Sequence, residues 1–268
     1  MKYDLFISDF DGTLGEYDRI DESTVKAIKE YESRGGIFTI VTGRSFASIS
    51  GIARKYGLKG KIVGFQGSLV ADIESGKIYM QEGVDFDTAL KISKILDEDG
   101  LDSVVWIDDV LYYANVSPYV KVFVSDNGVK CQKVDSVTNT IEKFGKMVNK
   151  VCAFASDDVL SSYVEKYSQI LGEGIIVNSG GKRLIEFINS KYNKGYAVEF
   201  LSKEFSIPFE KIIAVGDSTN DLPLMDKRWH CVAVGDGSSA LKNKAKEITV
   251  PFSENPVKVL LEKYCLKD

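Results

Sequence analysis

The stretch that most constrains the fold of this chain lies near its start, where an apolar run leads directly into two aspartates. Residues 3–7 are mostly apolar, and the segment SDFDG follows at residues 8–12. An apolar run that ends at a glycine turn is typical of a strand buried on both faces, and open α/β sheets bind ligands beyond the carboxyl ends of such strands. The stretch therefore predicts a central strand that carries Asp9 and Asp11 to the binding edge of a sheet.

The spacing of the two aspartates suggests a metal site but does not require one. Side chains alternate along a strand, so Asp9 and Asp11 point to the same side unless the turn intervenes. Close carboxylates repel each other unless a cation or a shared proton lies between them, and a hard divalent metal relieves this repulsion most simply. The same pattern also fits a plain strand-to-turn segment or a fragment of a calcium loop. Taken alone, the stretch leaves these interpretations open.

Length and charge exclude some classes of protein. The chain has 268 residues, of which 44% are hydrophobic, so it can form a large core as one large domain or two smaller ones. Its 34 basic and 39 acidic residues give a net charge of −5 without a basic tract, so we expect no nucleic-acid partner. An acidic protein that handles an anionic substrate needs local positive charge, from a metal or from a few placed Lys and Arg residues.

Cysteine spacing and the absence of long apolar runs predict the compartment. The four cysteines are widely separated and show no paired metal spacing, so we expect them to be reduced and mostly buried. The first residues lack the basic and apolar regions of a secretory signal, and no later run approaches the length of a membrane span. We therefore expect a cytoplasmic protein without a membrane partner.

The first part of the chain shows the pattern of a βαβ unit. Asp21 begins a helical pattern that stops at Gly35, and the apolar run 37–41 then ends on Thr42. A right-handed crossover places the end of the second strand beside the end of the first, which brings Thr42 near Asp9. A third strand is expected at residues 62–65, followed by a hairpin turn at residues 74–77.

The pattern changes at about Val84, where hairpins become mixed with helices. Such a mixture indicates an antiparallel sheet with helices on one face. We predict an inserted α+β domain at residues 84–188, within a doubly wound, Rossmann-like α/β core formed by residues 1–83 and 189–268. The insert is expected to contain helices that begin near Asp87, Asp135 and Asp157, and strands at 103–107, 110–114, 120–124, 151–155, 174–177 and 184–188.

The parallel pattern resumes after the insert. Asn193 opens a helix that runs to Phe205, and the strand 211–215 ends on the polar segment GDSTND. Another strand is expected at residues 231–234, with helices that begin at Ser238 and Asn255.

Four motifs, in this order, resemble those of the haloacid dehalogenase superfamily: Asp9-Phe10-Asp11-Gly12-Thr13, Thr42-Gly43-Arg44, Asn193-Lys194-Gly195 and Gly216-Asp217-Ser218-Thr219-Asn220-Asp221. The insert between the second and third motifs resembles the large C2-type cap of the Cof-type phosphatases. The resemblance covers nearly the whole chain. Two segments depart from it, because Gln66-Gly67 stands where many relatives have Asn-Gly and residues 234–237 stand where many have Met-Gly-Asn-Ala. These departures leave the shape of the substrate rim open.

The resemblance implies a Mg²⁺-dependent phosphatase that forms an aspartyl phosphate. Asp9 would be the nucleophile, and Asp11 would act first as an acid and then as a base. The carboxylates of Asp9 and Asp217 and the backbone carbonyl of Asp11 would hold Mg²⁺, with Asp221 in support of the metal site and of Lys194. The phosphate-binding residues implied are Phe10, Thr42, Gly43, Lys194 and Asn220.

Each of these motifs also has a plain structural interpretation. Lys194 alone would be a solvated lysine on a helix, and Thr42-Gly43 alone would be an ordinary turn from strand to helix. Asp221 fits the N-cap of the helix that follows it. Asp217 is harder to explain in this way, because a carboxylate at the end of a buried strand needs a partner.

The resemblance favours a small phosphorylated metabolite as substrate, with sugar phosphates the preferred class. The insert would cover the site and select the substrate. A phosphomutase or phosphotransferase is the alternative within the superfamily, and a non-catalytic phosphosugar-binding regulator is the alternative outside enzymes. With a single histidine, His230, a Ser-His-Asp site is disfavoured. We expect a monomer or a weak homo-oligomer. Candidate substrate contacts in the insert are Asn178, Ser179, Lys182 and Arg183, the last two of which also fit solvated loop charges.

Overall fold

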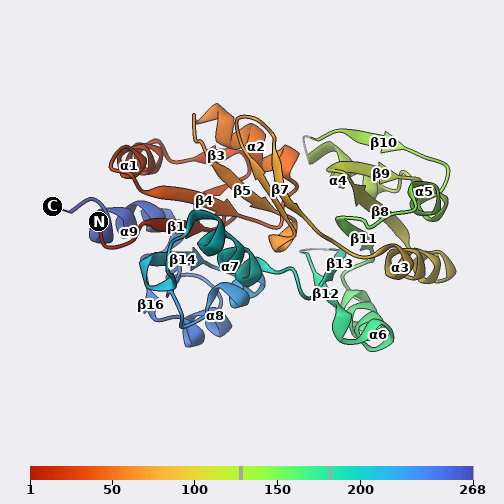
Figure 1. Cartoon of the computed structure of the whole chain (residues 1–268). Helices are drawn as coiled ribbons and strands as arrows, with labels where there is room; N and C mark the ends of the chain where they lie inside the picture. The colour runs from red at the N-terminus through yellow and green to blue at the C-terminus, as the bar shows by residue number, and fades with distance from the viewer. Residues whose placement is uncertain (127–128, 181–182, 268) are drawn as a thin grey trace. The chain divides into compact units, whose positions relative to one another are not determined.

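A computed structural model describes residues 1–126, 129–180 and 183–267 of the chain. The chain divides into two compact units, each described here by itself (Figure 1). Unit 1 contains Met1–Met80 and the chain from Asn193 onward, and unit 2 contains Gln81–Tyr192. Our expected domain boundaries lie after residues 83 and 188, whereas the units meet after Met80 and Tyr192. No helix among the described residues is both long and apolar enough to cross a bilayer.

Unit 1 is built on an eight-stranded sheet whose central strand is β1. The strand order is β16-β15-β14-β1-β4-β5-β6-β7, and β1 pairs in parallel with β14 on one side and β4 on the other. The expected α/β class with a parallel core sheet is thus confirmed. The strands are β1 (Leu5–Ser8), β4 (Ile37–Val41), β5 (Lys61–Gly64), β6 (Leu69–Asp72), β7 (Ile78–Gln81), β14 (Ile212–Gly216), β15 (His230–Ala233) and β16 (Glu247–Ile248).

Helices cover both faces of this sheet, as the apolar runs of its strands require. Side chains alternate along β1, so that Phe6 packs into one core and its neighbours Leu5 and Ile7 pack into the other. Helices α1 (Glu22–Ser33), α2 (Phe46–Lys55) and α9 (Pro256–Tyr264) contribute to the first core, and α7 (Lys194–Phe205) and α8 (Ser239–Lys244) contribute to the second. Shorter elements complete the unit: strands β2 (Gly15–Glu16) and β3 (Arg19–Ile20), and 3₁₀ helices η1 (Phe65–Gly67), η3 (Phe209–Lys211), η4 (Thr219–Leu224) and η5 (Phe252–Glu254).

Unit 2 is an α+β unit with a six-stranded sheet in the order β10-β9-β8-β11-β13-β12. All its neighbouring strands are antiparallel except β9 and β10, which are parallel. Residues of α3, α5 and α6 form one hydrophobic core with the sheet. The elements are α3 (Phe86–Glu98), β8 (Asp102–Ile107), β9 (Val110–Tyr113), α4 (Pro118–Asp126), β10 (Cys131–Lys133), α5 (Val137–Phe144), β11 (Lys150–Phe154), α6 (Leu160–Leu171), η2 (Gly172–Gly174), β12 (Ile175–Ser179) and β13 (Leu184–Asn189).

The prediction of a strand at residues 120–124 is wrong, because this segment lies within helix α4. Pro118 occupies the first helical position, where its missing N–H is not needed. The buried Val120 and the partly buried Phe123 are three residues apart, so they share one face of a helix, and Phe123 packs against the ring of Phe154. The β-branched composition of the segment was therefore less informative than its helical spacing.

Two helix starts in unit 2 also differ from the prediction. The N-cap of α3 is Asp85, which accepts a hydrogen bond from the backbone N–H of Thr88 at 3.0 Å, so the helix begins before Asp87. Helix α6 begins at Leu160, three residues beyond the expected start at Asp157. The start of α3 is set by the cap at Asp85, whereas Val159, the N-cap of α6, makes no side-chain capping hydrogen bond.

Candidate functional site

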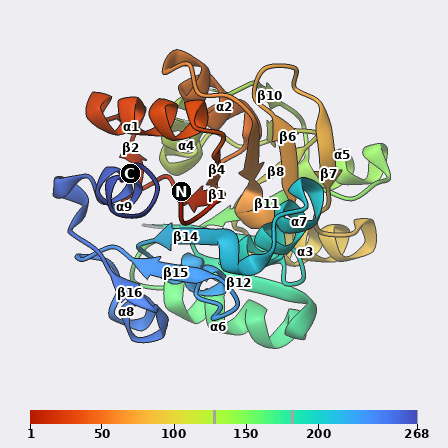
Figure 2. The same cartoon turned by 60° about the vertical axis from the view of Figure 1, so that its left-hand side comes forward.

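Several polar side chains meet at the carboxyl edge of the unit 1 sheet. Figure 2 shows β1 between β4 and β14, and each of these strands leads into a polar segment. Asp9 follows β1, Thr42 follows β4 and Asp217 follows β14. Because the three strands are parallel neighbours, their carboxyl ends lie at one edge, as the sequence predicted.

Lys194 joins this edge from the first turn of α7. Its side chain is completely buried, and its Nζ donates hydrogen bonds to Asp9 Oδ1 at 2.6 Å and to Asp221 Oδ1 at 2.5 Å. Burial by itself lowers the pKa of Lys194, but the charges of Asp221 and Asp9 outweigh it, so the pKa is raised and the lysine is an ammonium. The interpretation of Lys194 as a solvated helix lysine is therefore wrong.

Both carboxylate oxygens of Asp221 already have partners within unit 1. Oδ1 accepts the hydrogen bond from Lys194, and Oδ2 accepts hydrogen bonds from the backbone N–H groups of Asp217 and Ser218, each at 3.0 Å. Ser218 is the N-cap of η4, and Asp221, at the third helical position (N3), completes a capping box with it. Asp221 is thus not the N-cap that its plain interpretation suggested, and it fixes both Lys194 and the loop that carries Asp217.

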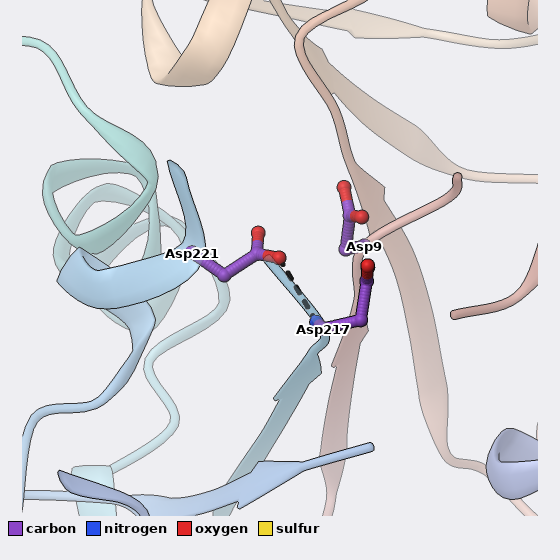
Figure 3. A group of neighbouring side chains, drawn as sticks. All are labelled: Asp9, Asp217 and Asp221. Carbon is purple, nitrogen blue, oxygen red and sulfur yellow. Dashed lines mark hydrogen bonds between the residues drawn. The ribbon is translucent and has the colours of Figure 1, made fainter. Parts of the chain in front are cut away.

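Asp9, Asp217 and Asp221 form a cluster in which one carboxylate oxygen from each residue lies within 4.8 Å of the others (Figure 3). Asp217 Oδ1 also accepts a hydrogen bond from the hydroxyl of Thr13 at 2.9 Å. Burial, together with the charge of Asp221, raises the pKa values of Asp9 and Asp217. When all three carboxyl groups are ionised, the single ammonium of Lys194 leaves two negative charges in a largely buried place, and a divalent cation would offset them.

Gly12 allows the first motif to approach this cluster closely. Its φ is +75°, and a Cβ at this position would lie 2.8 Å from Asp217 Oδ2. Only glycine combines the left-handed backbone with this approach at no steric cost. The turn that the plain interpretation of the Asp-Gly pair required is therefore present, and it also places Asp217 next to the first motif.

Asp11 lies outside the acidic cluster, although the sequence placed it beside Asp9. Its side chain is half exposed and accepts two hydrogen bonds from Arg44, from Nε to Oδ2 at 2.8 Å and from Nη2 to Oδ1 at 2.5 Å. Arg44 stands in the second motif, but sequence reasoning gave it no role. Its position directly after Thr42 and Gly43 was the signal that could have identified it.

The loop after β4 is tied to the loop after β5. The backbone N–H of Gln66 donates to the carbonyl of Thr42 at 2.9 Å, and the N–H of Arg44 donates to the Thr42 hydroxyl at 3.2 Å. A Cβ on Gly43 would lie 2.5 Å from Gln66 Nε2, so the buried Gln66 side chain covers this glycine. Gln66 adopts a left-handed conformation (φ 62°), which asparagine also tolerates. The departure from Asn-Gly therefore places a longer amide against the second motif.

Two other predicted phosphate-binding residues, Phe10 and Asn220, have their side chains engaged elsewhere in unit 1. The ring of Phe10 is fully buried in a core of unit 1, so its backbone is the only part available to a ligand. Asn220 is partly buried in η4, and its Oδ1 accepts a hydrogen bond from the hydroxyl of Ser218 at 2.5 Å. Among the described residues, the side chains of Phe10 and Asn220 form no hydrogen bond or ion pair with Asp9 or Lys194, so their role in phosphate binding remains a prediction.

The predicted substrate contacts of the insert lie in unit 2. Asn178 and Ser179 end β12, and the buried Oδ1 of Asn178 has no hydrogen-bond partner among the described residues. Arg183 forms an ion pair with Asp157 at 3.4 Å, and its guanidinium lies 4.9 Å from the centre of the Tyr119 ring. Its side chain is therefore held by two contacts, unlike that of a fully solvated loop residue. Lys182 lies outside the described residues.

Comparisons with known proteins agree with this geometry. A family model described as haloacid dehalogenase-like hydrolase matches residues 6–261. The 5-amino-6-(5-phospho-D-ribitylamino)uracil phosphatase of Bacillus subtilis is 27% identical, with 97% of each chain covered. A haloacid dehalogenase-like hydrolase from Bacteroides thetaiotaomicron has a similar structure, with a TM-score of 0.86, 20% identity and coverage of 98% of this chain and 99% of that one. A sugar phosphatase of HAD subclass IIB superposes with a TM-score of 0.82, 18% identity and coverage of 97% and 98%.

Proposed function

Because the chain belongs to the haloacid dehalogenase-like hydrolases, we propose that it is a Mg²⁺-dependent phosphatase that hydrolyses a small phosphomonoester through an aspartyl phosphate. The observation that carries this proposal is the buried cluster of Asp9, Asp217, Asp221 and Lys194 at the carboxyl edge of the sheet. A carboxylate nucleophile, a cation site and a fixed ammonium are the groups that phosphoryl transfer to an enzyme carboxylate needs.

The carboxylates of Asp9 and Asp217 would hold the cation, together with the backbone carbonyl of Asp11. Asp221 would support the site through the hydrogen bonds that fix the Asp217 loop and Lys194. When bound, Mg²⁺ supplies positive charge that offsets the phosphoryl group and the carboxylates around it. The two negative charges left by Asp9, Asp217, Asp221 and Lys194 support this assignment.

In the first proposed step, a carboxylate oxygen of Asp9 attacks phosphorus. The new oxygen–phosphorus bond forms as the ester bond breaks, and Asp11 gives its proton to the leaving alkoxide. In the second step Asp11 takes a proton from water, the water oxygen attacks phosphorus, and the bond to Asp9 breaks. The products are an alcohol and phosphate, and both carboxyl groups return to their starting states. Thr42, the backbone of Gly43 and Lys194 would hold phosphoryl oxygens.

We propose a sugar phosphate or a related polyol phosphate as substrate, with unit 2 as the cap that selects it. The names of two similar proteins support this class, since one acts on a phosphoribityl compound and the other is a sugar phosphatase. The four free cysteines fit a protein that acts in the reducing cytoplasm, and the negative net charge disfavours nucleic acid as a partner.

Release of phosphate from p-nitrophenyl phosphate tests the proposed reaction. We expect turnover with Mg²⁺ and none with EDTA, and we expect Asp9→Asn to abolish turnover because an amide oxygen is a poor nucleophile. With an alkyl phosphate as substrate, whose leaving group needs a proton, Asp11→Asn should slow turnover by about 10²–10⁴-fold, the range for loss of a general acid or base. Full activity of Asp9→Asn would refute the role of the nucleophile.

A screen over sugar phosphates, nucleotides and cofactor phosphates, with and without sugar acceptors, tests the substrate class. Release of inorganic phosphate supports hydrolysis. Transfer of phosphate to a sugar would instead indicate a phosphotransferase, and binding of phosphosugars without Mg²⁺-dependent turnover would indicate a regulator.

A further inference from the structure

We propose that Arg44 is a positioning residue for Asp11, which it holds in the orientation required for proton transfer to the leaving group. This inference rests on the proposed function, because it concerns the acid that protonates the departing oxygen. It assigns a role to a residue that neither the acidic cluster nor the phosphate-binding set includes.

Within unit 1, the carboxylate of Asp11 is oriented by Arg44. Among the described residues only Arg44 donates hydrogen bonds to it, and both oxygens are engaged, at 2.8 and 2.5 Å. The Asp11 side chain is 50% exposed and does not take part in the packing that fixes Asp9 and Asp221. Without Arg44, this carboxylate would turn freely between rotamers.

Arg44 itself is fixed by three further contacts. Its Nη1 donates to the carbonyl of Tyr17 at 2.7 Å, in the turn between β2 and β3. Its guanidinium carbon lies 4.8 Å from the centre of the buried Phe10 ring, and its backbone N–H donates to the hydroxyl of Thr42. The guanidinium therefore donates one hydrogen bond to the turn between β2 and β3 and two to the carboxylate of Asp11. A lysine ammonium could not reproduce this planar arrangement.

This geometry has a consequence that depends on the leaving group. An alkoxide leaves slowly unless it is protonated, whereas p-nitrophenolate is stable enough to leave without a proton. The ratio kcat/KM reports the reaction up to departure of this group. Loss of the orientation of Asp11 should therefore lower kcat/KM for alkyl phosphates much more than for p-nitrophenyl phosphate.

The test compares Arg44→Gln with the wild-type protein on both kinds of substrate. We expect kcat/KM for an alkyl phosphate to fall by at least about 10-fold, which is part of the effect of a general acid, and that for p-nitrophenyl phosphate to fall by less than about 3-fold. Arg44→Lys should recover only part of the loss. In an Asp11→Asn background, Arg44→Gln should have no further effect, because the two residues act as one unit.

Arg228 provides a matched control. It also forms ion pairs with two carboxylates, Glu199 at 2.6 Å and Asp226 at 2.8 Å, and its guanidinium lies 5.0 Å from the ring of Phe209. Arg228→Gln should leave the ratio of the two kcat/KM values unchanged. Thermal unfolding of each variant shows whether the fold is retained.

Three results would overturn the role of Arg44. These are equal losses on both substrates, a rise in KM for both that indicates binding of the phosphoryl group, and a loss that adds to that of Asp11→Asn. Failure of the proposed function is seen separately, because the wild-type protein would then release no phosphate in the presence of Mg²⁺.

Discussion

Lys194→Met would leave two buried carboxylates without their positive charge, and the structure allows its effect to be estimated. Nζ lies 2.6 Å from Asp9 and 2.5 Å from Asp221, and all three side chains are almost fully shielded from solvent. Removing one partner of a buried ion pair costs about 3–5 kcal/mol, because the remaining charge stays buried and unpaired. At about 2–4 °C per kcal/mol, we expect the unfolding midpoint of unit 1 to fall by about 6–20 °C.

Differential scanning calorimetry in EDTA measures this shift. Lys211→Met is the control in the same unit, since Lys211 lies 3.9 Å from Asp4 and both side chains are 42% exposed. Exposed pairs contribute about 0–1 kcal/mol, so this variant should melt close to the wild-type protein. A midpoint of Lys194→Met within about 2 °C of wild type would refute the reasoning, because it would mean a cost below about 1 kcal/mol.

The same variant tests the charge balance of the cluster. Lys194 is the cation that pairs with this cluster in the described part of the chain, so without its ammonium a divalent cation should bind more tightly. We therefore expect Mg²⁺ to raise the unfolding midpoint more in Lys194→Met than in the wild-type protein. The variant should nevertheless release no phosphate, because it lacks the lysine proposed to hold the phosphoryl group. Equal stabilisation of the two proteins by Mg²⁺ would contradict the proposed cation site.

Three further predictions concern other parts of the chain. Gly12→Ala should cost about 1–2 kcal/mol in unfolding free energy because of its left-handed backbone, and its Cβ near Asp217 should weaken stabilisation by Mg²⁺; calorimetry measures both. Burial lowers the pKa of His230 despite its hydrogen bond to Glu247, so the unfolded chain binds the proton more readily and the unfolding free energy should fall as the pH drops below about 6.5. Urea titrations of wild type and His230→Gln at several pH values should show a flatter profile for the variant. Cys131 is only partly buried, but burial raises the pKa of its thiol, so under native conditions a thiol reagent should modify it slowly, and the other three cysteines, which are buried, only after unfolding.

The core of unit 1 was predictable because its strands are continuous apolar runs that end on polar motifs. The helix from Lys194 to Phe205 and the end of β14 before Asp217 lie where the sequence placed them. Parallel strands bring their carboxyl ends to one edge, so the proximity of Asp9, Asp217 and Lys194 follows from topology.

The parts that the sequence did not predict depend on side-chain direction and on mixed signals. Asp9 and Asp11 were expected to point to the same side unless the turn intervened; in the structure Asp11 lies outside the acidic cluster and accepts hydrogen bonds from Arg44. Such a pairing joins residues 33 positions apart and leaves no periodic pattern. In unit 2, β-branched residues at 120–124 suggested a strand, although their spacing also fits the helix that forms.

The order of the strands in unit 1 also limits when its site can form during synthesis. Strand β1 pairs with β14, so Leu5 lies opposite Ile212, and Asp9 meets Lys194 only after about 185 intervening positions have been made. Unit 2 is a continuous segment with its own core, so it can fold on the ribosome while β1 still lacks one neighbour. The nascent chain therefore carries an open strand edge and the carboxylate of Asp9 without its lysine partner until the C-terminal part emerges, and this interval is when the protein is most exposed to misassembly.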